Sequence, residues 1–425
     1  MNLDLSKIKK IHFIGIGGIG ISALAKMAIS RGIKVSGVND DESPQTLEPL
    51  RQAGAEIKMS KAGFDIDIPN ADLYIYSDAW IYRGPEIIES AKKTGKPVLS
   101  YFEALGEFAK EYKVISIAGT HGKTTTTAMV AEILVAGGLD PTVIVGSFVK
   151  KFGSNFRAGN PSTSSGQEVN YLVVEADEYN RHFLNFHPFI GVVTNIEADH
   201  LDCYKDLEDI QNAFDKFLSQ TENKILDYSK YLAEVPKLSV PGEHNRMNAA
   251  AAMAVADVLN IDKEIAKRAL SEFSGTWRRL EKRGQTEKGT IIYDDYAHHP
   301  TEIKASLEAL RELYPTGEKK IIVLFQPHLY SRTKALFNDF AKCFKGADNI
   351  FLLPIFFARE AKDESISSEK LASAITLAGD KAKAFPDFEL AEAYIKELNL
   401  GENDIFVTMG AGEAYKVADK VFHLV

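Results

Sequence analysis

The chain has 425 residues, which is long for one hydrophobic core and predicts two or three domains. Its 45% hydrophobic and 26% charged residues are typical of a globular protein, and the net charge of -9 argues against bulk binding to nucleic acid or to a membrane surface. No run of about 18 apolar residues occurs, so we expect no membrane insertion. The two cysteines, Cys203 and Cys343, lie far apart without a CxxC partner, which favours a reducing, cytoplasmic location.

The first hundred residues alternate strand and helix patterns. The stretch "KKIHFIGIGGIGISALA" predicts a strand, a turn containing Gly15, Gly17, Gly18 and Gly20, and a helix. Glycines let backbone N–H groups approach a diphosphate, and a helix N-terminus favours negative charge. A dinucleotide site also needs an acidic residue about 20 positions on, and residues 39–42, "NDDE", lie there. The turn fits NAD, FAD or any nucleoside diphosphate, and it also fits a purely structural turn.

A second strand, glycine turn and helix follow in "YKVISIAGTHGKTTTTAMVAEILVAGG". Only two residues separate Gly119 from Gly122, whereas the common P-loop has four between its first glycine and its Gly-Lys-Ser/Thr. Lys123 is placed to reach outer phosphates, and the Thr124 hydroxyl is placed to bind Mg²⁺. The stretch therefore predicts a nucleotide site, with a threonine-rich helix start without a ligand as the alternative.

Polar side chains end the next two predicted strands. The strand "YLVVEAD" ends with Glu175 and Asp177, and "IGVVTNIEADHLD" ends with Asn195, Glu197, Asp199 and His200. Open α/β sheets bind ligands at the carboxyl ends of parallel strands. Mg²⁺ prefers oxygen ligands, so a histidine ligand is unusual. Beside the Gly-Lys-Thr turn, these strand ends predict metal ligands.

A third region, after "GTWRRLE", again alternates strands and helices. Asp295, Tyr296 and His298 follow the strand in "TIIYDDYAHHP", and His328 and Arg332 follow the strand in "KKIIVLFQPHLYSR". Together they supply cations that bind carboxylates and groups that accept protons. The alternating pattern predicts an α/β protein of three domains: a Rossmann-like N-terminal domain (1–107), a central P-loop ATPase-like parallel sheet (108–275) and a Rossmann-like C-terminal domain (276–425).

The ordered set "IHFIGIGGIGISALA", "AGTHGKTTTT", "TNIEADHLD", "GEHNRMNAAAA", "DDYAHHP", "QPHLYSRT" and "TMGAGE" resembles the Mur ligases, the ATP-dependent amide-forming enzymes of peptidoglycan precursor synthesis. The resemblance covers nearly the whole chain and is strongest to the members that attach L-alanine to UDP-N-acetylmuramate. It implies that the first domain binds the UDP-sugar, the second binds ATP and Mg²⁺, and the third binds the amino acid. It also implies an acyl-phosphate intermediate. We expect a monomer or a homodimer.

The resemblance further implies roles for individual residues. The first glycine turn would face the uridine diphosphate together with Ser77. The residues implied for ATP are Gly119, Thr120, Gly122, Lys123, Thr124, Thr125, Asn195, His244, Asn248, Arg278 and Asp295. The implied Mg²⁺ ligands are Thr124, Glu175 and His200. The implied alanine contacts are Tyr296, His298, His328 and Arg332, and His121 would face the muramyl carboxylate. The implied catalytic residues are Lys123, His121, His298 and Arg332.

The chain departs from the family pattern at several places. Leu329 stands where the alanine-adding members often have arginine, Asn39 stands where aspartate is usual, and Glu413 also replaces an aspartate. Residues 219–240 are few for the small extra sheet of the ATP domain. Three alternatives therefore stay open: a recycling ligase that attaches a whole peptide to the same UDP-sugar, a nucleotide-binding regulator without turnover, and a nicotinamide-dependent dehydrogenase, in which the Gly-Lys-Thr turn has no role.

Overall fold

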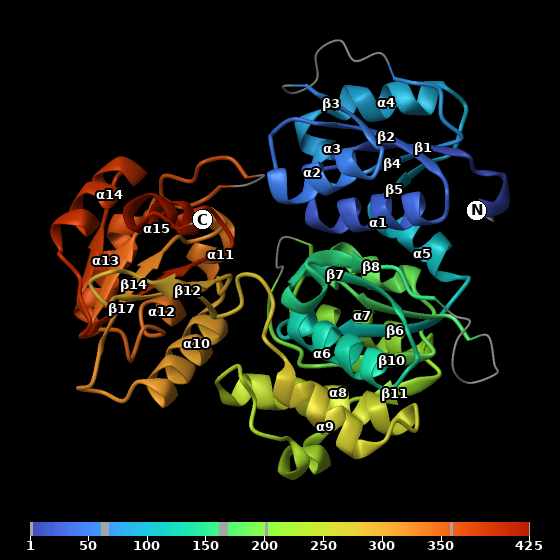
Figure 1. Cartoon of the computed structure of the whole chain (residues 1–425). Coiled ribbons are helices and arrows are strands. Elements are labelled where there is room, and N and C mark those ends of the chain that lie inside the picture. The colour runs from blue at the N-terminus through green and yellow to red at the C-terminus, as the bar shows by residue number, and fades with distance from the viewer. Residues whose placement is uncertain (1–2, 61–67, 161–168, 200–202, 358–359, 425) are drawn as a thin grey trace. The chain divides into compact units, whose positions relative to one another are not determined.

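The computed structural model of the chain describes residues 3–60, 68–160, 169–199, 203–357 and 360–424. They form three β-sheets with helices packed against them (Figure 1). The first two sheets belong to one compact unit, which holds the described residues up to 198 together with 203–236 and 248–273. The third sheet belongs to a second unit, with residues 199, 237–247 and 274 onward. The predicted α/β class with three domains is confirmed, and the boundaries at 107 and 275 stay predictions.

The first sheet is parallel throughout, with the strand order β3-β2-β1-β4-β5. The order reverses between β1 and β4, and open α/β sheets bind ligands beyond the carboxyl ends of their strands at such a point. The strands are β1 (Lys10–Ile14), β2 (Lys34–Asn39), β3 (Glu56–Met59), β4 (Leu73–Tyr76) and β5 (Val98–Ser100). The helices are η1 (Leu5–Lys7), α1 (Ile19–Ser30), α2 (Pro44–Gln52), α3 (Trp80–Arg83), α4 (Pro85–Lys93) and α5 (Tyr101–Ala109).

The second sheet has the order β11-β10-β6-β9-β7-β8, and only its edge pair β7–β8 is antiparallel. β6 lies between β9 and β10, so the ends of these three strands meet at one edge. The strands are β6 (Lys113–Ala118), β7 (Thr142–Val149), β8 (Ser154–Arg157), β9 (Tyr171–Glu175), β10 (Ile190–Val193) and β11 (Asn223–Ile225). The helices are α6 (Lys123–Ala136), η2 (Lys150–Phe152), η3 (Tyr179–Asn185), α7 (Leu207–Ser219), η4 (Ser229–Glu234), α8 (Glu243–Val258) and α9 (Lys263–Glu272).

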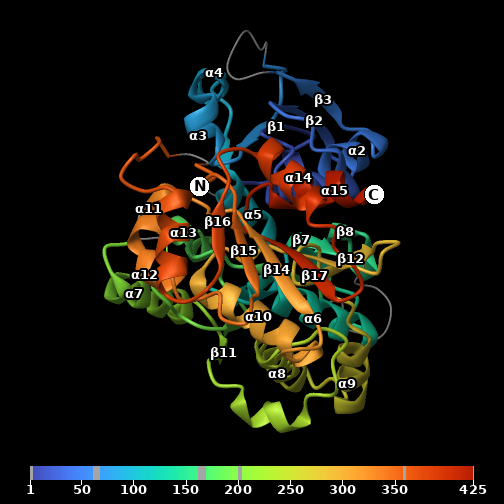
Figure 2. The ribbon, with the colours of Figure 1, turned by 90° about the vertical axis from the view of Figure 1, so that its left-hand side faces the viewer.

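The third sheet has the order β12-β13-β17-β14-β15-β16, with β12 antiparallel at one edge (Figure 2). Its two faces are covered by separate hydrophobic clusters, so both faces are buried. The strands are β12 (Glu281–Gln285), β13 (Ile291–Asp295), β14 (Lys320–Phe325), β15 (Asn349–Leu352), β16 (Ala382–Ala384) and β17 (Asp404–Met409). The helices are α10 (Pro300–Leu313), α11 (Tyr330–Ala335), α12 (Phe337–Phe340), α13 (Ser368–Leu377), α14 (Phe388–Glu397) and α15 (Ala414–Phe422).

A continuous apolar core explains why the first two sheets form one unit. Ile11 of β1 and Phe108 of α5 belong to the same buried cluster as Phe183 of η3 and Phe217 of α7. Burying apolar surface stabilises a fold by about 25 cal/mol per Å². One core therefore packs against β1, β4, β6 and β9.

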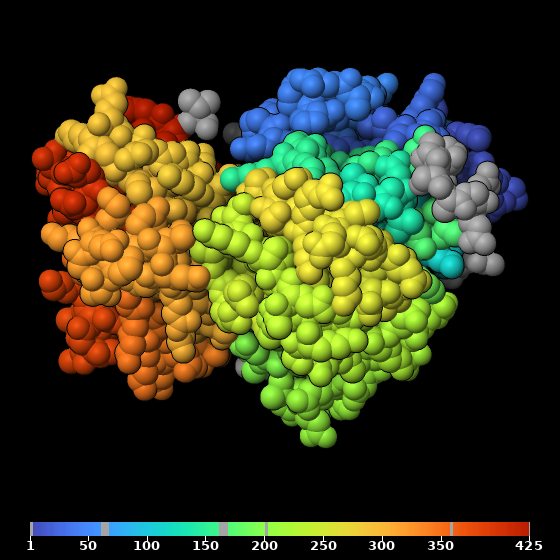
Figure 3. Space-filling model, turned by 60° about the horizontal axis from the view of Figure 1, so that its bottom comes forward, coloured from blue at the N-terminus to red at the C-terminus, as the bar shows by residue number. Residues whose placement is uncertain are grey.

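The segment between α7 and α8 is short, as the sequence indicates. Residues 219–240 contain only β11, which joins the second sheet, and the 3₁₀ helix η4. They form no separate sheet, and together with α8 and α9 they make up the yellow-green and yellow surface in Figure 3. In the described parts of the chain, no helix has the length and apolar character to cross a membrane.

Candidate functional site

The first glycine turn joins β1 to α1 and is closely packed. Gly15 has a φ of 79°, a left-handed conformation that glycine adopts at little cost. Asn39, at the end of β2, accepts the Gly17 N–H on its Oδ1 at 3.0 Å. A Cβ added to Gly20 would lie 2.9 Å from the Tyr101 ring. Side chains of the protein itself therefore already require glycine here, before any ligand is considered.

Ser77, the other residue predicted to face the uridine diphosphate, lies at the end of β4, next to β1 in the sheet. Ser77 follows β4 directly, and its N–H donates to Ile14 O, the last residue of β1, at 2.9 Å. Gly18 precedes the first turn of α1, so the helix N-terminus opens onto the glycine turn. The turn and Ser77 thus flank the point where the strand order reverses, as a nucleoside diphosphate site requires.

The second glycine turn joins β6 to α6. Gly119 and Gly122 have φ values of 131° and 83°, and the Asn248 side chain fills the space beside Gly122. The Thr120 Oγ1 accepts the Glu197 N–H at 2.9 Å, which ties the turn to the segment after β10. Asn248, which the resemblance implies for ATP, therefore lies beside the predicted glycine turn.

Lys123 is surrounded by oxygen atoms. Its Nζ donates to Gly119 O at 2.6 Å and to Thr120 O at 3.1 Å, and it lies 2.8 Å from a carboxylate oxygen of Glu178. Burial alone would lower the pKa of Lys123, but the negative charges of Glu178, Asp177 and Glu175 outweigh burial and raise it. Lys123 is thus held as a partly buried cation, its side chain 16% exposed, beside the backbone N–H groups at the start of α6.

Thr124 and Glu175 provide oxygen ligands side by side. The Thr124 Oγ1 donates to Glu175 Oε2 at 3.1 Å, and the Gly146 N–H donates to Glu175 Oε1 at 2.5 Å. A hydroxyl and a carboxylate are the donors that Mg²⁺ prefers, so these residues fit the predicted metal. Thr125, the next residue of α6, is 8% exposed. The third predicted ligand, His200, lies outside the described residues.

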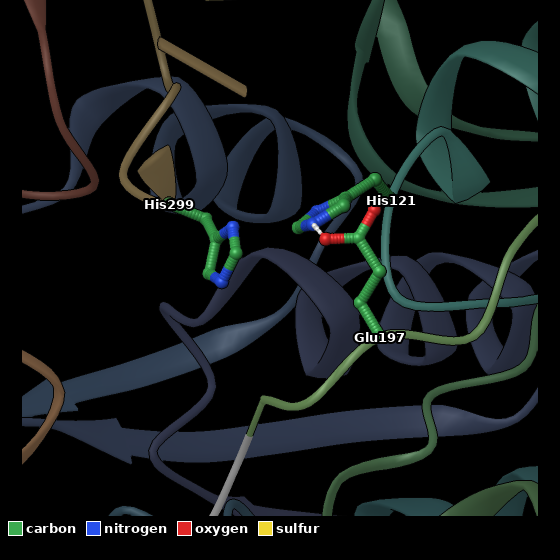
Figure 4. A group of neighbouring side chains, drawn as sticks. All are labelled: His121, Glu197 and His299. Carbon is green, nitrogen blue, oxygen red and sulfur yellow. Dashed lines mark ion pairs between the residues drawn. The ribbon is translucent and has the colours of Figure 1, made fainter. Parts of the chain in front are cut away.

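His121 occupies the position between the two glycines. Its N–H donates to Asn195 Oδ1 at 2.9 Å, and the Asn195 Nδ2 donates back to His121 O at 3.1 Å. Its Nε2 lies 3.6 Å from Glu197 Oε2, an ion pair when the imidazole is protonated (Figure 4). Asn195 therefore fixes the backbone of the turn, and the Glu197 carboxylate lies near the imidazole.

In the second unit, the predicted residue Asp295 ends β13 and carries a buried carboxyl group. Asp295 accepts hydrogen bonds from Ser306 Oγ and from the Ala297 N–H. Burial raises the pKa of Asp295 to about 6. The sequence explains the local structure, because His299 and Glu302 form a capping box that starts α10 at Pro300.

His298 is held as a neutral imidazole. Its Nδ1 lies 2.9 Å from Tyr296 O, and a carbonyl oxygen only accepts, so Nδ1 carries the proton. Burial lowers the pKa of His298 to about 4. The lone pair is therefore on Nε2, which makes this atom a proton acceptor near neutral pH.

Arg332 and His328 lie together after β14. The Arg332 Nε donates to Asp199 Oδ1 at 3.1 Å, and its Nη1 lies 3.3 Å from His328 Nδ1. The His328 ring stacks on Phe356 with the centroids 5.5 Å apart. Arg332, 8% exposed, thus already holds a carboxylate, which is the chemistry needed for an amino-acid carboxylate.

Arg278 is buried within the second unit, and His244 is half-buried there. Arg278 donates to Asp294 Oδ2 at 2.8 Å, to Gly410 O at 2.7 Å and to Gly412 O at 3.1 Å. Burial lowers the pKa of His244, in α8, to about 4. The hydrogen bonds of Arg278 cross-link β13 to the segment after β17, and its predicted role toward ATP stays a prediction.

Sequence reasoning missed Glu178, the ion-pair partner of Lys123. The motif "VVEADE" draws attention to Glu175 and Asp177, whereas Glu178 lies beyond the strand end. Glu178 is 2% exposed, and its carbonyl oxygen accepts from Tyr204 Oη. A third acidic residue within four positions of a buried strand end was the available signal, but only the tertiary structure shows which one meets the lysine.

Three family models match successive parts of the chain. They are described as "Mur ligase family, catalytic domain" for residues 10–113, "Mur ligase middle domain" for residues 117–231, and "Mur ligase, glutamate ligase domain" for residues 278–412. Each match contains one of the three sheets or most of it.

Individual proteins are similar over the full length. The UDP-N-acetylmuramate–L-alanine ligase of Clostridium kluyveri is 39% identical, with 99% of both chains covered. The crystal structure of the UDP-N-acetylmuramate-alanine ligase of Thermotoga maritima has a TM-score of 0.80 at 28% identity, covering 97% of this chain and 98% of that one. A murein peptide ligase from Psychrobacter arcticus has a TM-score of 0.69 at 23% identity, covering 98% of each, which shows a shared fold.

Proposed function

The chain belongs to the Mur ligase family, and from this we propose that it joins the carboxylate of UDP-N-acetylmuramate to L-alanine as an amide, using ATP, in peptidoglycan precursor synthesis. The observation that carries the proposal is the second glycine turn, where the partly buried Lys123 cation lies beside the Thr124–Glu175 oxygen pair. Full-length similarity to relatives that bear this activity in their names supports the choice of substrates. The dehydrogenase alternative leaves this turn without a role.

The chemistry explains why such a turn is needed. A carboxylate is a poor electrophile near neutral pH and must be activated before an amine can attack it. One carboxylate oxygen attacks the γ-phosphorus of ATP and displaces ADP, which gives an acyl phosphate. The amine then attacks the acyl carbon and displaces phosphate, a good leaving group. Both reactants are negatively charged and repel each other. Lys123, with the backbone N–H groups of its turn, reduces this repulsion, and groups of this kind contribute several kcal/mol to lowering a barrier. His121, whose Nε2 lies 3.6 Å from Glu197 Oε2, would face the acceptor carboxylate.

Mg²⁺ is part of the proposal. Thr124 and Glu175 would hold it, because the pair offers a hydroxyl and a carboxylate oxygen at the strand end. When bound, the ion neutralises phosphate charge. Within the chain, the Gly146 N–H keeps the Glu175 carboxylate oriented toward Thr124.

The second unit is proposed to supply the amino-acid site. Arg332 pairs with the Asp199 carboxylate, and the carboxylate of alanine would take a similar place on the guanidinium. The amine of alanine attacks only in its neutral form. The Nε2 lone pair of His298 can accept the proton that the amine loses.

A second candidate is a recycling ligase that attaches a whole peptide to the same UDP-sugar. Leu329 favours it, because this residue is 4% exposed and apolar where alanine-adding members often have arginine. One anchor for the carboxylate of a free amino acid is therefore missing. A regulator that binds ATP without turnover is the third reading, and it predicts no ADP release.

The deciding experiment is an ADP-release assay with UDP-N-acetylmuramate, Mg²⁺-ATP and a panel of acceptors. Release with alanine, serine or glycine supports the first proposal, and release only with the cognate peptide supports the recycling ligase. No release with any acceptor removes both ligase proposals. The cytoplasmic location and the state of monomer or homodimer stay predictions, and size measurement in solution tests the latter.

A further inference from the structure

Asp78 and His182 form a pair that joins distant parts of the first unit. Asp78 follows Ser77 at the end of β4, and His182 lies in η3, after β9. The His182 Nε2 lies 2.9 Å from Asp78 Oδ2. The side chains are 10% and 27% exposed, respectively, so the contact is largely shielded from water. The pair therefore connects the first sheet to the second by a charge-assisted hydrogen bond.

The imidazole is held on several sides. The Phe102 ring of α5 stacks on it with the centroids 4.0 Å apart and an interplanar angle of 17°. The Tyr179 ring meets it edge-on at 6.0 Å. Two buried atoms of the pair, His182 Nδ1 and Asp78 Oδ1, have no hydrogen-bond partner among the described residues. Buried polar atoms without a hydrogen-bond partner destabilise a fold. A contribution to stability therefore does not explain this pair, and a functional role is a better explanation.

From Asp78, contacts lead to the first glycine turn. The Trp80 N–H donates to Ser77 O at 2.8 Å, so Asp78 lies inside a tight turn that starts α3. Trp80 is 2% exposed, and its indole ring fills the space where a Cβ of Gly15 would be. A shift of Asp78 would therefore move the indole against the turn that is proposed to bind the diphosphate.

From His182, contacts lead to the second glycine turn. Asn180 and Arg181 adopt left-handed φ values of 49° and 59°, which are costly for residues other than glycine. Arg181 is anchored by Asp209, whose two carboxylate oxygens lie 2.8 and 2.9 Å from its Nη2. This strained turn sets His182 four residues after Glu178, the partner of Lys123. Strain of this kind persists where the surroundings impose it, often at functional sites.

We propose that Asp78 and His182 are positioning residues, which hold the sugar-nucleotide turn at a fixed distance and orientation from the phosphate turn. The inference rests on the proposed function, since it assigns the two turns to the two substrates of the phosphoryl-transfer step. The transfer needs the acceptor carboxylate to lie in line with the γ-phosphate, and small misplacements of reacting atoms lower rates strongly. Neither residue needs to touch the reacting atoms.

The test is a double-mutant cycle with Asp78→Ala, His182→Ala and the double variant in the ADP-release assay. Each single variant should lower kcat/KM for UDP-N-acetylmuramate about tenfold, the effect of losing one charge-assisted hydrogen bond. The double variant should lose no more than either single variant. His182→Gln, which keeps a donor, should recover part of the loss. KM for alanine should change less than about twofold, because the pair lies in the other unit.

A matched control separates positioning from simple destabilisation. His12 is also a buried histidine of the first unit, 3% exposed, and its Nδ1 lies 2.9 Å from Ser36 Oγ. His12→Ala should lower the melting temperature and leave kcat/KM of the folded enzyme nearly unchanged. If the losses of Asp78→Ala and His182→Ala add up, or if the His12 variant shows the same kinetic loss, the positioning role is wrong.

A binding measurement distinguishes this inference from the proposed function. The chain has two tryptophans, so in a Trp277→Phe background Trp80 is the only one left. Its emission should respond to UDP-N-acetylmuramate, and His182→Ala should weaken that response. If the wild-type enzyme releases no ADP with any acceptor, the proposed function is wrong. The Trp80 titration then still tests whether Asp78 and His182 position the first glycine turn. An equal change in Trp80 emission with and without His182→Ala, both in the Trp277→Phe background, overturns the inference.

Discussion

The two glycine turns occupy equivalent places and have different surroundings. Each follows a strand inside its sheet, β1 or β6, and each precedes a long helix, α1 or α6. Around the first turn, the neighbours are the rings of Trp80 and Tyr101 and the amide of Asn39. Around the second turn, they are Thr194, the amide of Asn248 and the partly buried Lys123 cation.

The difference shows how one backbone design serves two ligands. In both turns, the helix N-terminus and the backbone N–H groups favour an anion. The first turn adds aromatic and amide surfaces, which suit a substrate that is bound and held. The second adds a cation and metal-ligand oxygens, which suit a phosphoryl group that is transferred. Side chains from neighbouring strands, rather than the turns themselves, therefore separate binding from chemistry.

The largest expected effect tests the cation of the second turn. Lys123→Gln should reduce ADP release about 1,000-fold, as loss of a group that stabilises transition-state charge does. The variant removes the Lys123 charge beside the buried Glu178 carboxylate, which destabilises the protein. The double variant Lys123→Gln/Glu178→Gln removes both charges and should fold, as circular dichroism and thermal melting would show, yet stay inactive. Activity near wild type in either variant would contradict the role of Lys123.

A matched pair of glycine substitutions compares the turns directly. Gly122→Ala and Gly15→Ala each place a Cβ at a left-handed φ and against a neighbouring side chain, Asn248 or Trp80. Each should destabilise the protein by about 1–3 kcal/mol. Gly122→Ala should act mainly on kcat and on KM for ATP, whereas Gly15→Ala should act mainly on KM for the UDP-sugar. Steady-state kinetics with each substrate varied would check this, and identical profiles would mean that the turns do not serve separate ligands.

A smaller effect concerns the amide that replaces the usual aspartate. Asn39 accepts the Gly17 N–H and donates from Nδ2 to Asp41 Oδ1 at 2.7 Å, and an aspartate cannot donate in this way. Asn39→Ala should raise KM for the UDP-sugar about tenfold, with KM for ATP unchanged. Asn248→Ala, at the second turn, is the matched variant. It should raise KM for ATP and leave KM for the UDP-sugar unchanged. A rise in both constants for either variant would contradict the assignment.

The smallest expected effect concerns the strands before the turns. Three residues before the first glycine of each turn stands a buried polar residue, His12 in β1 and Ser116 in β6. Burial, followed by the charge of Lys58, lowers the pKa of His12 to about 4 from an unfolded value of about 6.5. As the pH falls, His12 is therefore protonated in the unfolded chain before it is protonated in the folded protein. Stability should be unaffected above pH 6.5 and fall between pH 6.5 and 4 by up to about 1.4 kcal/mol per pH unit.

Urea unfolding at pH 7 and pH 5 checks this prediction. The loss of stability between the two pH values should be about 1–2 kcal/mol smaller in His12→Gln than in the wild type. Ser116→Ala is the control, because serine does not titrate in this range, and its loss should equal that of the wild type. An unchanged pH dependence in His12→Gln would show that the imidazole is not protonated on unfolding.

Much of the fold could be predicted from the sequence because buried parallel strands are continuous apolar runs. The strands β1, β9, β13, β14 and β17 follow such runs. The edge strands β8, "SNFR", and β12, "EKRGQ", were not predicted. Both are polar and pair antiparallel at a sheet edge, where one side faces water and the pattern is weak.

The sequence by itself determined the two glycine turns, the strand ends beside them and the family. Glycine, lysine and threonine at fixed spacing demand one local backbone, and that information is short-range. Only the tertiary structure decided that Glu178 meets Lys123, that Asn39 caps the first turn, and that Asp78 pairs with His182. These contacts join residues 22 to 104 positions apart, because packing of strands and helices around the shared core brings their chain segments together.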